Sequence, residues 1–134
     1  MPNATFIDWD SGHEDIPAQI SARAPFDLIV SRRGPTSVIQ HLPALAAADS
    51  HFLYAGPRDA DLLEEIAAKI ESIDWQVTWS AVIMARGFLP TFEEYTLYNK
   101  FGALPGSRVA FDAVATARGF PIVETRCVVV ATPV

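Results

Sequence analysis

The sequence is poor in the residues that crosslink a chain or carry it through a membrane. Its 134 residues include one cysteine, Cys127, which excludes an internal disulfide and a cysteine-based zinc motif. No apolar run approaches the roughly 18 residues that a membrane-spanning helix needs. The N-terminus also lacks a basic segment followed by an apolar core. We therefore expect a cytoplasmic protein with no membrane contact.

Positive charge is scarce as well. Ten Lys and Arg residues stand against 16 Asp and Glu residues, which gives a net charge of −6 at pH 7. Such a surface repels phosphate backbones, and the one basic pair is Arg32-Arg33, so we predict no nucleic-acid partner. The acidic residues between Asp8 and Asp15 surround His13, a pattern more typical of a solvated loop than of a cation site. We predict no bound metal.

Hydrophobic residues make up 50% of the chain, a large share for a small protein. A chain of this length holds one domain, and its single core cannot hide all of that apolar surface. We therefore expect several copies of the chain to associate, which would bury the remaining apolar surface. Residues 1–25 show no sustained periodicity and predict an irregular N-terminal extension, followed by a single domain over residues 26–134.

The hydrophobic pattern predicts strands and helices in alternation. Apolar and β-branched runs indicate strands, apolar residues at helical spacing behind capping residues indicate helices, and residues 37–50 stay ambiguous. The expected strands are 26–31, 51–55, 76–85, 107–115 and 121–132, and the expected helices are 61–73 and 91–101. This order predicts an α+β fold with a mixed sheet and two helices packed on one face.

Charged residues interrupt the last two expected strands. Arg108 lies in the first of them and Glu124 in the second. A charged side chain in the middle of a buried strand costs free energy unless it forms an ion pair or takes part in binding or catalysis. These residues are therefore candidates for a site, and the alternative is a solvated sheet face that carries an Arg/Glu ion pair.

Several local motifs, taken in order over residues 34–131, resemble the Rid/YjgF family of reactive-intermediate imine deaminases. No single motif is specific, and the ordered set carries the likeness. The motifs are a Gly-Pro-Thr-Ser turn at 34–37, HFLYAG at 51–56, a helix with FEEYTLYNKFG at 92–102, LPGSR at 104–108 and IVE at 122–124.

The resemblance implies a fold like that of the small trimeric chorismate mutase, with sites in clefts between the subunits of a homotrimer. It implies that Arg108 binds a substrate carboxylate and that Glu124 directs a water molecule at an imine carbon. It also implies that Thr36, Ser37 and Tyr95 line the substrate site. The expected activity is hydrolytic deamination of a small imine or enamine without an organic cofactor.

The sequence departs from that family at the expected site, which leaves other functions open. Thr36 stands where the family has a tyrosine, and Tyr95 stands where it has an asparagine, so the pocket is reshaped. The alternatives are another reaction of a small molecule, such as cyclisation, tautomerisation or decarboxylation, and a ligand-binding trimer without catalysis. A further idea, catalysis by an N-terminal amine at Pro2, is outweighed by an ordinary processed terminus.

Overall fold

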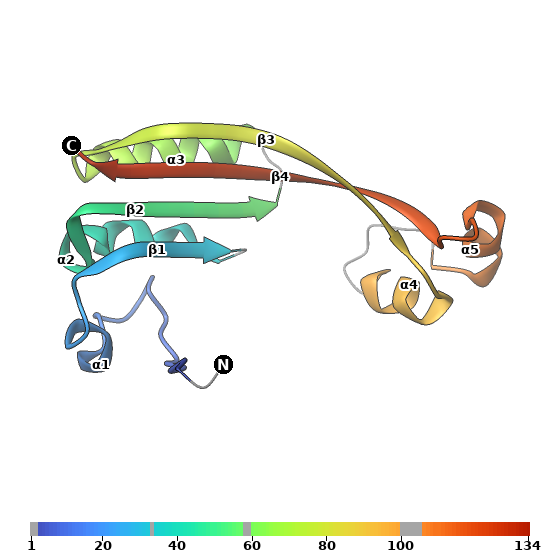
Figure 1. Cartoon of the computed structure of the whole chain (residues 1–134), viewed down its shortest axis with the longest axis horizontal. Helices are drawn as coiled ribbons and strands as arrows, with labels where there is room; N and C mark the ends of the chain where they lie inside the picture. The colour runs from blue at the N-terminus through green and yellow to red at the C-terminus, as the bar shows by residue number, and fades with distance from the viewer. Residues whose placement is uncertain (1–2, 33, 58–59, 100–105) are drawn as a thin grey trace. The chain divides into compact units, whose positions relative to one another are not determined.

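The computed structural model describes residues 3–32, 34–57, 60–99 and 106–134 (Figure 1). Pro2, Arg33, Phe101, Gly102 and the Leu104-Pro105 part of the expected motif lie outside these residues. The elements in chain order are α1 (Ala18–Ser21), β1 (Phe26–Arg32), the 3-10 helix η1 (Thr36–His41), α2 (Leu42–Leu45), β2 (Ala46–Pro57), α3 (Ala60–Ser72), β3 (Trp75–Leu89), α4 (Phe92–Asn99), α5 (Arg108–Val114) and β4 (Phe120–Pro133).

One mixed sheet of four strands organises the protein, in the order β1-β2-β4-β3. Strands β1 and β2 are parallel, with Ile29 opposite Phe52, whereas β2 and β4 are antiparallel, with Phe52 opposite Ala131. The arrowheads of β1 and β2 accordingly point the same way in Figure 1, and that of β4 points the opposite way. The predicted α+β class with a mixed sheet is confirmed, whereas a trimer is not shown.

The chain divides into two compact units, here called the first and the second unit. The first unit comprises Met1–Ile83 with Arg126–Val134, and the second comprises Met84–Thr125. Each unit has its own cluster of buried hydrophobic side chains.

The core of the first unit lies between the sheet and its helices. Phe52 from β2 and Val129 from β4 point into it, as the two-residue periodicity of strands requires. Ile39 of η1, Leu42 of α2 and Ile66 of α3 cover them. The helical spacing of apolar residues in 61–73 thus predicts the packing of α3 correctly.

The second unit is built around aromatic rings. Tyr95 of α4, Phe111 of α5 and Phe120 of β4 are buried together, and the Tyr95 and Phe120 ring centroids lie 4.8 Å apart. Helix α4 therefore packs in this cluster and not in the core that holds α3, so the expectation of two helices in one layer is wrong. Gly119 makes the turn before β4 with a φ of 112°, a conformation that other residues adopt only with strain.

The segment expected as a strand at 107–115 is helix α5, which is a correction of the sequence prediction. The Ser107 hydroxyl caps this helix by accepting a hydrogen bond from the Ala110 amide at 3.1 Å. Arg108 and Asp112 then lie one turn apart and pair at 3.1 Å. The cap, with a small contribution from this exposed pair, favours a helix over the strand preference of the valines in this segment.

Candidate functional site

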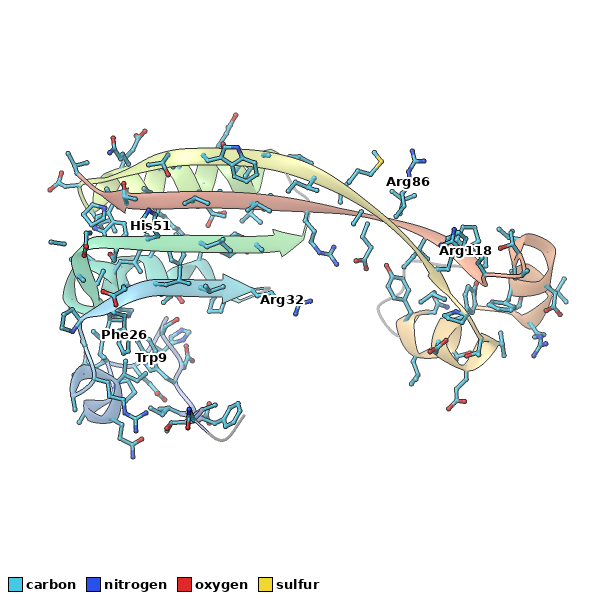
Figure 2. All side chains as sticks on the ribbon, in the orientation of Figure 1. Trp9, Phe26, Arg32, His51, Arg86 and Arg118 are labelled. Carbon is cyan, nitrogen blue, oxygen red and sulfur yellow. The ribbon has the colours of Figure 1, made fainter. Side chains whose placement is uncertain are left out.

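The parallel strands β1 and β2 end at the same edge of the sheet, at Arg32 and Pro57. In open α/β sheets, ligands bind outside the carboxyl ends of parallel strands, because the loops and helix starts there leave polar groups accessible. Arg32 is exposed at this edge, and Figure 2 shows it at the end of β1. The residues after β1 are therefore the first place to look for a site.

The turn after β1 is attached to the neighbouring strand. The Tyr54 hydroxyl of β2 donates a hydrogen bond to the Gly34 carbonyl at 3.5 Å. Burial raises the pKa of the Tyr54 phenol, and the nearby Cys127 and Glu65 groups raise it further. A Cβ atom at Gly34 would lie 2.8 Å from the Ser31 hydroxyl, so a larger residue would require the Ser31 side chain to move.

A polar trio of Thr36, Glu65 and Lys69 joins η1 to α3. The Lys69 ammonium donates to the Thr36 hydroxyl at 2.6 Å and pairs with the Glu65 carboxylate at 2.8 Å. The Lys69 and Glu65 side chains are 41% and 53% exposed, so the pair itself adds little to stability. The hydrogen bond from Lys69 does fix the position of the Thr36 hydroxyl beside the turn at Gly34.

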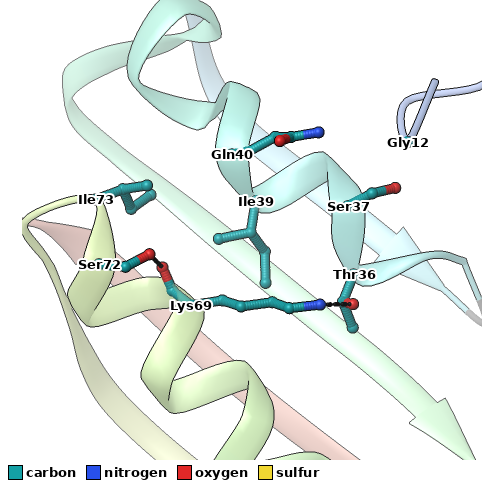
Figure 3. A pocket seen from close by; sticks show the side chains of 8 residues that line it. All are labelled: Gly12, Thr36, Ser37, Ile39, Gln40, Lys69, Ser72 and Ile73. Carbon is teal, nitrogen blue, oxygen red and sulfur yellow. Dashed lines mark hydrogen bonds between the residues drawn. The ribbon is translucent and has the colours of Figure 1, made fainter. Parts of the chain in front are cut away.

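A cavity of about 280 Å³ opens next to this trio, between η1 and α3 (Figure 3). Thr36, Ser37 and Gln40 line one side of it, and Lys69 and Ser72 line the other. The predicted substrate-binding residues Thr36 and Ser37 are thus brought together at one cavity, although their role stays a prediction.

The N-terminal segment packs against η1. The Ser11 and Ser37 hydroxyls share a hydrogen bond of 2.7 Å, and the Ser11 carbonyl accepts from His41 Nε2 at 2.8 Å and from Gln40 Nε2 at 3.1 Å. These contacts hold the segment against η1 and beside the cavity. The described part of the segment, residues 3–25, is irregular apart from the single turn α1 (Ala18–Ser21).

The acidic residues of that segment make local contacts. Asp10 accepts a hydrogen bond from the His13 ring at 3.0 Å and another from the Gly12 amide at 3.1 Å. The bond from His13, followed by that from Gly12, lowers the pKa of the Asp10 carboxyl. Among the residues that the structure describes, no group of three or more His, Cys, Asp or Glu side chains could hold a metal ion.

The other predicted site residues, Arg108, Glu124 and Tyr95, lie in the second unit. The Arg108 guanidinium pairs with Asp112 and lies 5.1 Å from the centroid of the Phe92 ring. Glu124 accepts a hydrogen bond from the Tyr98 hydroxyl at 2.7 Å. The predicted constellation is therefore distributed over both units, and the roles of these three residues stay predictions.

Tyr95 is fully buried, and its hydroxyl has no hydrogen-bond partner among the described residues. Its ring packs against Phe92, Phe111 and Phe120. Tyr95 therefore belongs to the core of the second unit.

Sequence reasoning missed the role of Glu65 and Lys69 at the cavity. A signal was present, because the two residues stand four apart on a helix that the sequence predicts, with the carboxylate first. Their contact with Thr36 could not be predicted, because it joins two elements 33 residues apart.

Comparison with known proteins gives matches among solved structures only. No protein-family model and no curated protein matches the chain. A functionally unknown protein from Deinococcus radiodurans R1 matches 99% of this chain at 39% identity with a TM-score of 0.73. A "putative methyltransferase" from Thermoplasma acidophilum matches 83% of this chain at 13% identity with a TM-score of 0.53. This chain spans 61% of the length of the Deinococcus protein and 40% of that of the Thermoplasma protein.

These matches overturn the assignment to the Rid/YjgF family. The chain resembles the Deinococcus and Thermoplasma structures, its own sheet contains the parallel β1-β2 pair, and no family model supports an imine deaminase or its homotrimer. The resemblance rested on short, unspecific motifs and on a strand at 107–115 that is a helix. The deaminase assignment, the homotrimer and the active site between its subunits are withdrawn with the family.

No helix among the described residues is long and apolar enough to span a membrane.

Proposed function

We propose that this chain is the acceptor-binding part of a methyltransferase-like enzyme that acts on a small, negatively charged molecule. The observation that carries this proposal is the mixed sheet β1-β2-β4-β3 with its parallel pair, on a fold similar to that of the Thermoplasma protein. At 13% identity that likeness supports the fold alone, so the activity is argued from the site at the carboxyl ends of β1 and β2.

Arg32 is the residue that binds the acceptor in this proposal. Its guanidinium is exposed at the end of β1, in a protein whose net charge is −6. A planar guanidinium offers paired donors to a carboxylate or a phosphate, which suits an acceptor with such a group. The surrounding negative charge would disfavour a polyanion such as a nucleic acid.

The turn at Gly34–Thr36 positions the acceptor beside Arg32. The Tyr54 hydroxyl of β2 donates to the Gly34 carbonyl, and the Lys69 ammonium of α3 donates to the Thr36 hydroxyl. A methyl-transfer reaction would require a lone pair of the acceptor to be aligned with the methyl group that a bound donor would supply. Such a reaction depends on alignment of the two reactants, so a rigid turn contributes more than a flexible one.

The methyl donor is assigned to no residue of this chain. A nucleoside donor of the S-adenosylmethionine type needs a glycine-rich turn between a strand and a helix, with an acidic residue for the ribose. The turn after β1 carries Gly34 and Pro35 and leads into the short η1, which does not fit that requirement. The proposal therefore has no step that depends on donor contacts within this chain.

Transfer of label from S-[methyl-³H]adenosylmethionine to the small-molecule fraction of a bacterial extract tests the proposal. The assay uses the chain itself and a chimera in which the chain replaces its matched region of the Deinococcus protein. Arg32→Gln should lower transfer about tenfold through a higher KM for the acceptor, the loss of about 1.4 kcal/mol of binding. Arg86→Gln, an exposed arginine of the second unit, is the matched control. No label in small molecules with either protein, or equal transfer by both variants, would overturn the proposal.

A nucleoside donor and a small anionic acceptor are metabolites of the cell interior, so the proposal keeps the cytoplasm as the expected location. Imine hydrolysis by Arg108 and Glu124 has lost its basis in a family resemblance. No observation bears on that reaction itself, and it is not part of this proposal.

A further inference from the structure

The cavity between η1 and α3 has the size of a site for a small molecule. Its volume of about 280 Å³ equals that of roughly nine water molecules in the liquid, at about 30 Å³ each. Small-molecule sites commonly measure about 300–1,000 Å³, so this cavity stands at the lower end of the range. Since a water molecule has one non-hydrogen atom, a ligand that fills the cavity has roughly ten.

Three elements of the first unit enclose this cavity, and hydrogen bonds join them. The Lys69 ammonium of α3 donates to the Thr36 hydroxyl of η1 at 2.6 Å, as the dashed line in Figure 3 shows. The Ser11 and Ser37 hydroxyls share a hydrogen bond of 2.7 Å, which holds the N-terminal segment and its Gly12 at the third side. The cavity thus has polar walls that are already in place.

The lining carries no excess charge. Among the described residues that line the cavity, Lys69 alone is charged, and its ammonium pairs with the Glu65 carboxylate at 2.8 Å. An anionic ligand at Lys69 would lie close to that carboxylate, and the two negative charges would repel each other. The net charge of −6 disfavours an anion further. The cavity therefore favours an uncharged ligand.

The Lys69 ammonium has a hydrogen-bond donor to spare. An ammonium carries three N–H donors, and here the Thr36 hydroxyl and the Glu65 carboxylate take two of them. No third acceptor contacts Lys69 among the residues that the structure describes, and the side chain is 41% exposed. An oxygen atom of a ligand can therefore accept the third hydrogen bond.

The hydroxyl groups of the lining are available mainly as acceptors. A hydroxyl group has one donor and two lone pairs. The Ser72 hydroxyl donates to the Lys69 carbonyl at 2.6 Å, and the Thr36 hydroxyl donates to the Glu65 carboxylate at 3.5 Å. Both oxygens keep a lone pair for an incoming donor. A fitting ligand must therefore donate to these oxygens and accept from Lys69, and a molecule with several hydroxyl groups does both.

The rest of the lining is apolar. Ile39 is 1% exposed and belongs to the core of the first unit, and Ile73 packs against that core. Both isoleucines line the cavity, so part of the ligand surface must consist of C–H groups. A polyol carries C–H and O–H groups on one small skeleton and meets both requirements.

We propose that the cavity between η1 and α3 binds a small, uncharged polyol of about the size of a pentose. Lys69 donates to one of its hydroxyl oxygens, other hydroxyls of the ligand donate to Ser72 and Thr36, and the carbon skeleton lies against the two isoleucines. This site is separate from the proposed acceptor site, whose anchor is Arg32 and whose ligand is an anion. The inference does not depend on methyl transfer.

Titration of the ¹⁵N-labelled chain with D-ribose and with xylitol, followed by the amide chemical shifts, tests this site. The amides of Ser37, Gln40 and Ile73 should shift together in the millimolar range. Lys69→Met keeps the length of the side chain and removes its donor, so it should weaken binding about tenfold. Glu71→Met, at an exposed residue of the same helix that does not line the cavity, is the matched control. Tighter binding of D-ribose 5-phosphate than of D-ribose would show an anion site and would overturn the proposal.

A second pair of variants keeps the site testable if the lysine variant does not fold. A Cβ atom at Gly12 would lie 3.5 Å from the Asp10 carboxylate and 3.6 Å from the Ser37 hydroxyl, which are ordinary contact distances. Gly12→Ala should therefore bind D-ribose as the unmodified chain does, whereas the larger side chain of Gly12→Leu should occupy part of the cavity and weaken binding several-fold. Arg32→Gln should lower methyl transfer and leave D-ribose binding unchanged, which separates the two proposals. No amide shifts around the cavity with either polyol, or equal binding by the two Gly12 variants, would overturn the inference.

Discussion

The two units bury their apolar side chains in different ways. The first unit packs aliphatic side chains of η1, α2 and α3 against alternate residues of the sheet. The second unit clusters the rings of Tyr95, Phe111 and Phe120 around two short helices. A regular layer repeats its pattern along the sequence, whereas a ring cluster does not. The first unit is therefore easier to read from the sequence and the second depends more on individual side chains.

The largest expected effect tests the sheet core of the first unit. Phe52 is fully buried at the centre of the sheet, so Phe52→Ala should destabilise the chain by about 4 kcal/mol through lost burial and the cavity left behind. Urea denaturation followed by circular dichroism measures this loss. Leu53→Ala, the half-buried neighbour on the opposite face, should cost clearly less, and equal losses would mean that the two faces of β2 are wrongly assigned.

The next effect tests whether the second unit has a core of its own. Phe111 is 7% exposed and contacts the rings of Phe92, Tyr95 and Phe120, so Phe111→Ala should cost about 3 kcal/mol within this unit. Side-chain NMR signals of Tyr95 and Phe120 should then lose dispersion, while those of the first unit keep it. Collapse of both sets of signals together would contradict the separation of the two cores.

A smaller effect tests the correction at α5. Ser107→Ala removes the cap of this helix and should cost about 1 kcal/mol. The Cα chemical shifts of Arg108–Val114 should move from helical toward random-coil values. Ser107→Asp, which restores a capping oxygen, should keep them helical. Strand-like shifts in the unmodified chain would restore the original sequence prediction.

The smallest expected effect is a loss of stability of the first unit at alkaline pH. Burial raises the pKa of Tyr54 above its ordinary value of 10.0. Below pH 10 the phenol is neutral in both states, and its contribution to stability is intact. Above that pH the unfolded chain ionises first, so stability falls as the pH rises toward the folded-state pKa. The urea midpoint of Tyr54→Phe should fall less between pH 8 and pH 11 than that of the unmodified chain, and equal falls would contradict the assigned pKa direction.

The sequence predicts three elements of the first unit well: the apolar run around Ile29 indicates β1, the alternation around Val77 indicates β3, and Ile66 and Ile70 at helical spacing indicate α3. Residues 37–50, which hold most of η1, all of α2 and the start of β2, stay ambiguous because they show neither period. The Thr91 and Glu94 capping box likewise predicts the start of α4, where the Thr91 hydroxyl accepts from the Glu94 amide at 3.2 Å. What the sequence cannot give is the order of the strands in the sheet, because pairing is set by contacts between distant residues.

The candidate site was predictable only in part for the same reason. Thr36 and Ser37 follow a strand and were named from a local motif, and they do line a cavity. Arg108 was interpreted as a strand residue because valine and alanine surround it, and the pairing with Asp112 that stabilises a helix was overlooked. The family motifs, three to eleven residues long, do not correct this interpretation, because turns and short helices and strands of many folds share them.

The direction of β1 relative to β2 is the feature on which the fold and the candidate site both depend. Nuclear Overhauser effects in the labelled chain measure it directly. The account predicts contacts between the backbone protons of Ile29 and those around Phe52 in the pattern of parallel strands, together with the close Hα–Hα contacts of an antiparallel pair between β2 and β4. Close Hα–Hα contacts between β1 and β2 would show an antiparallel pair and would contradict it.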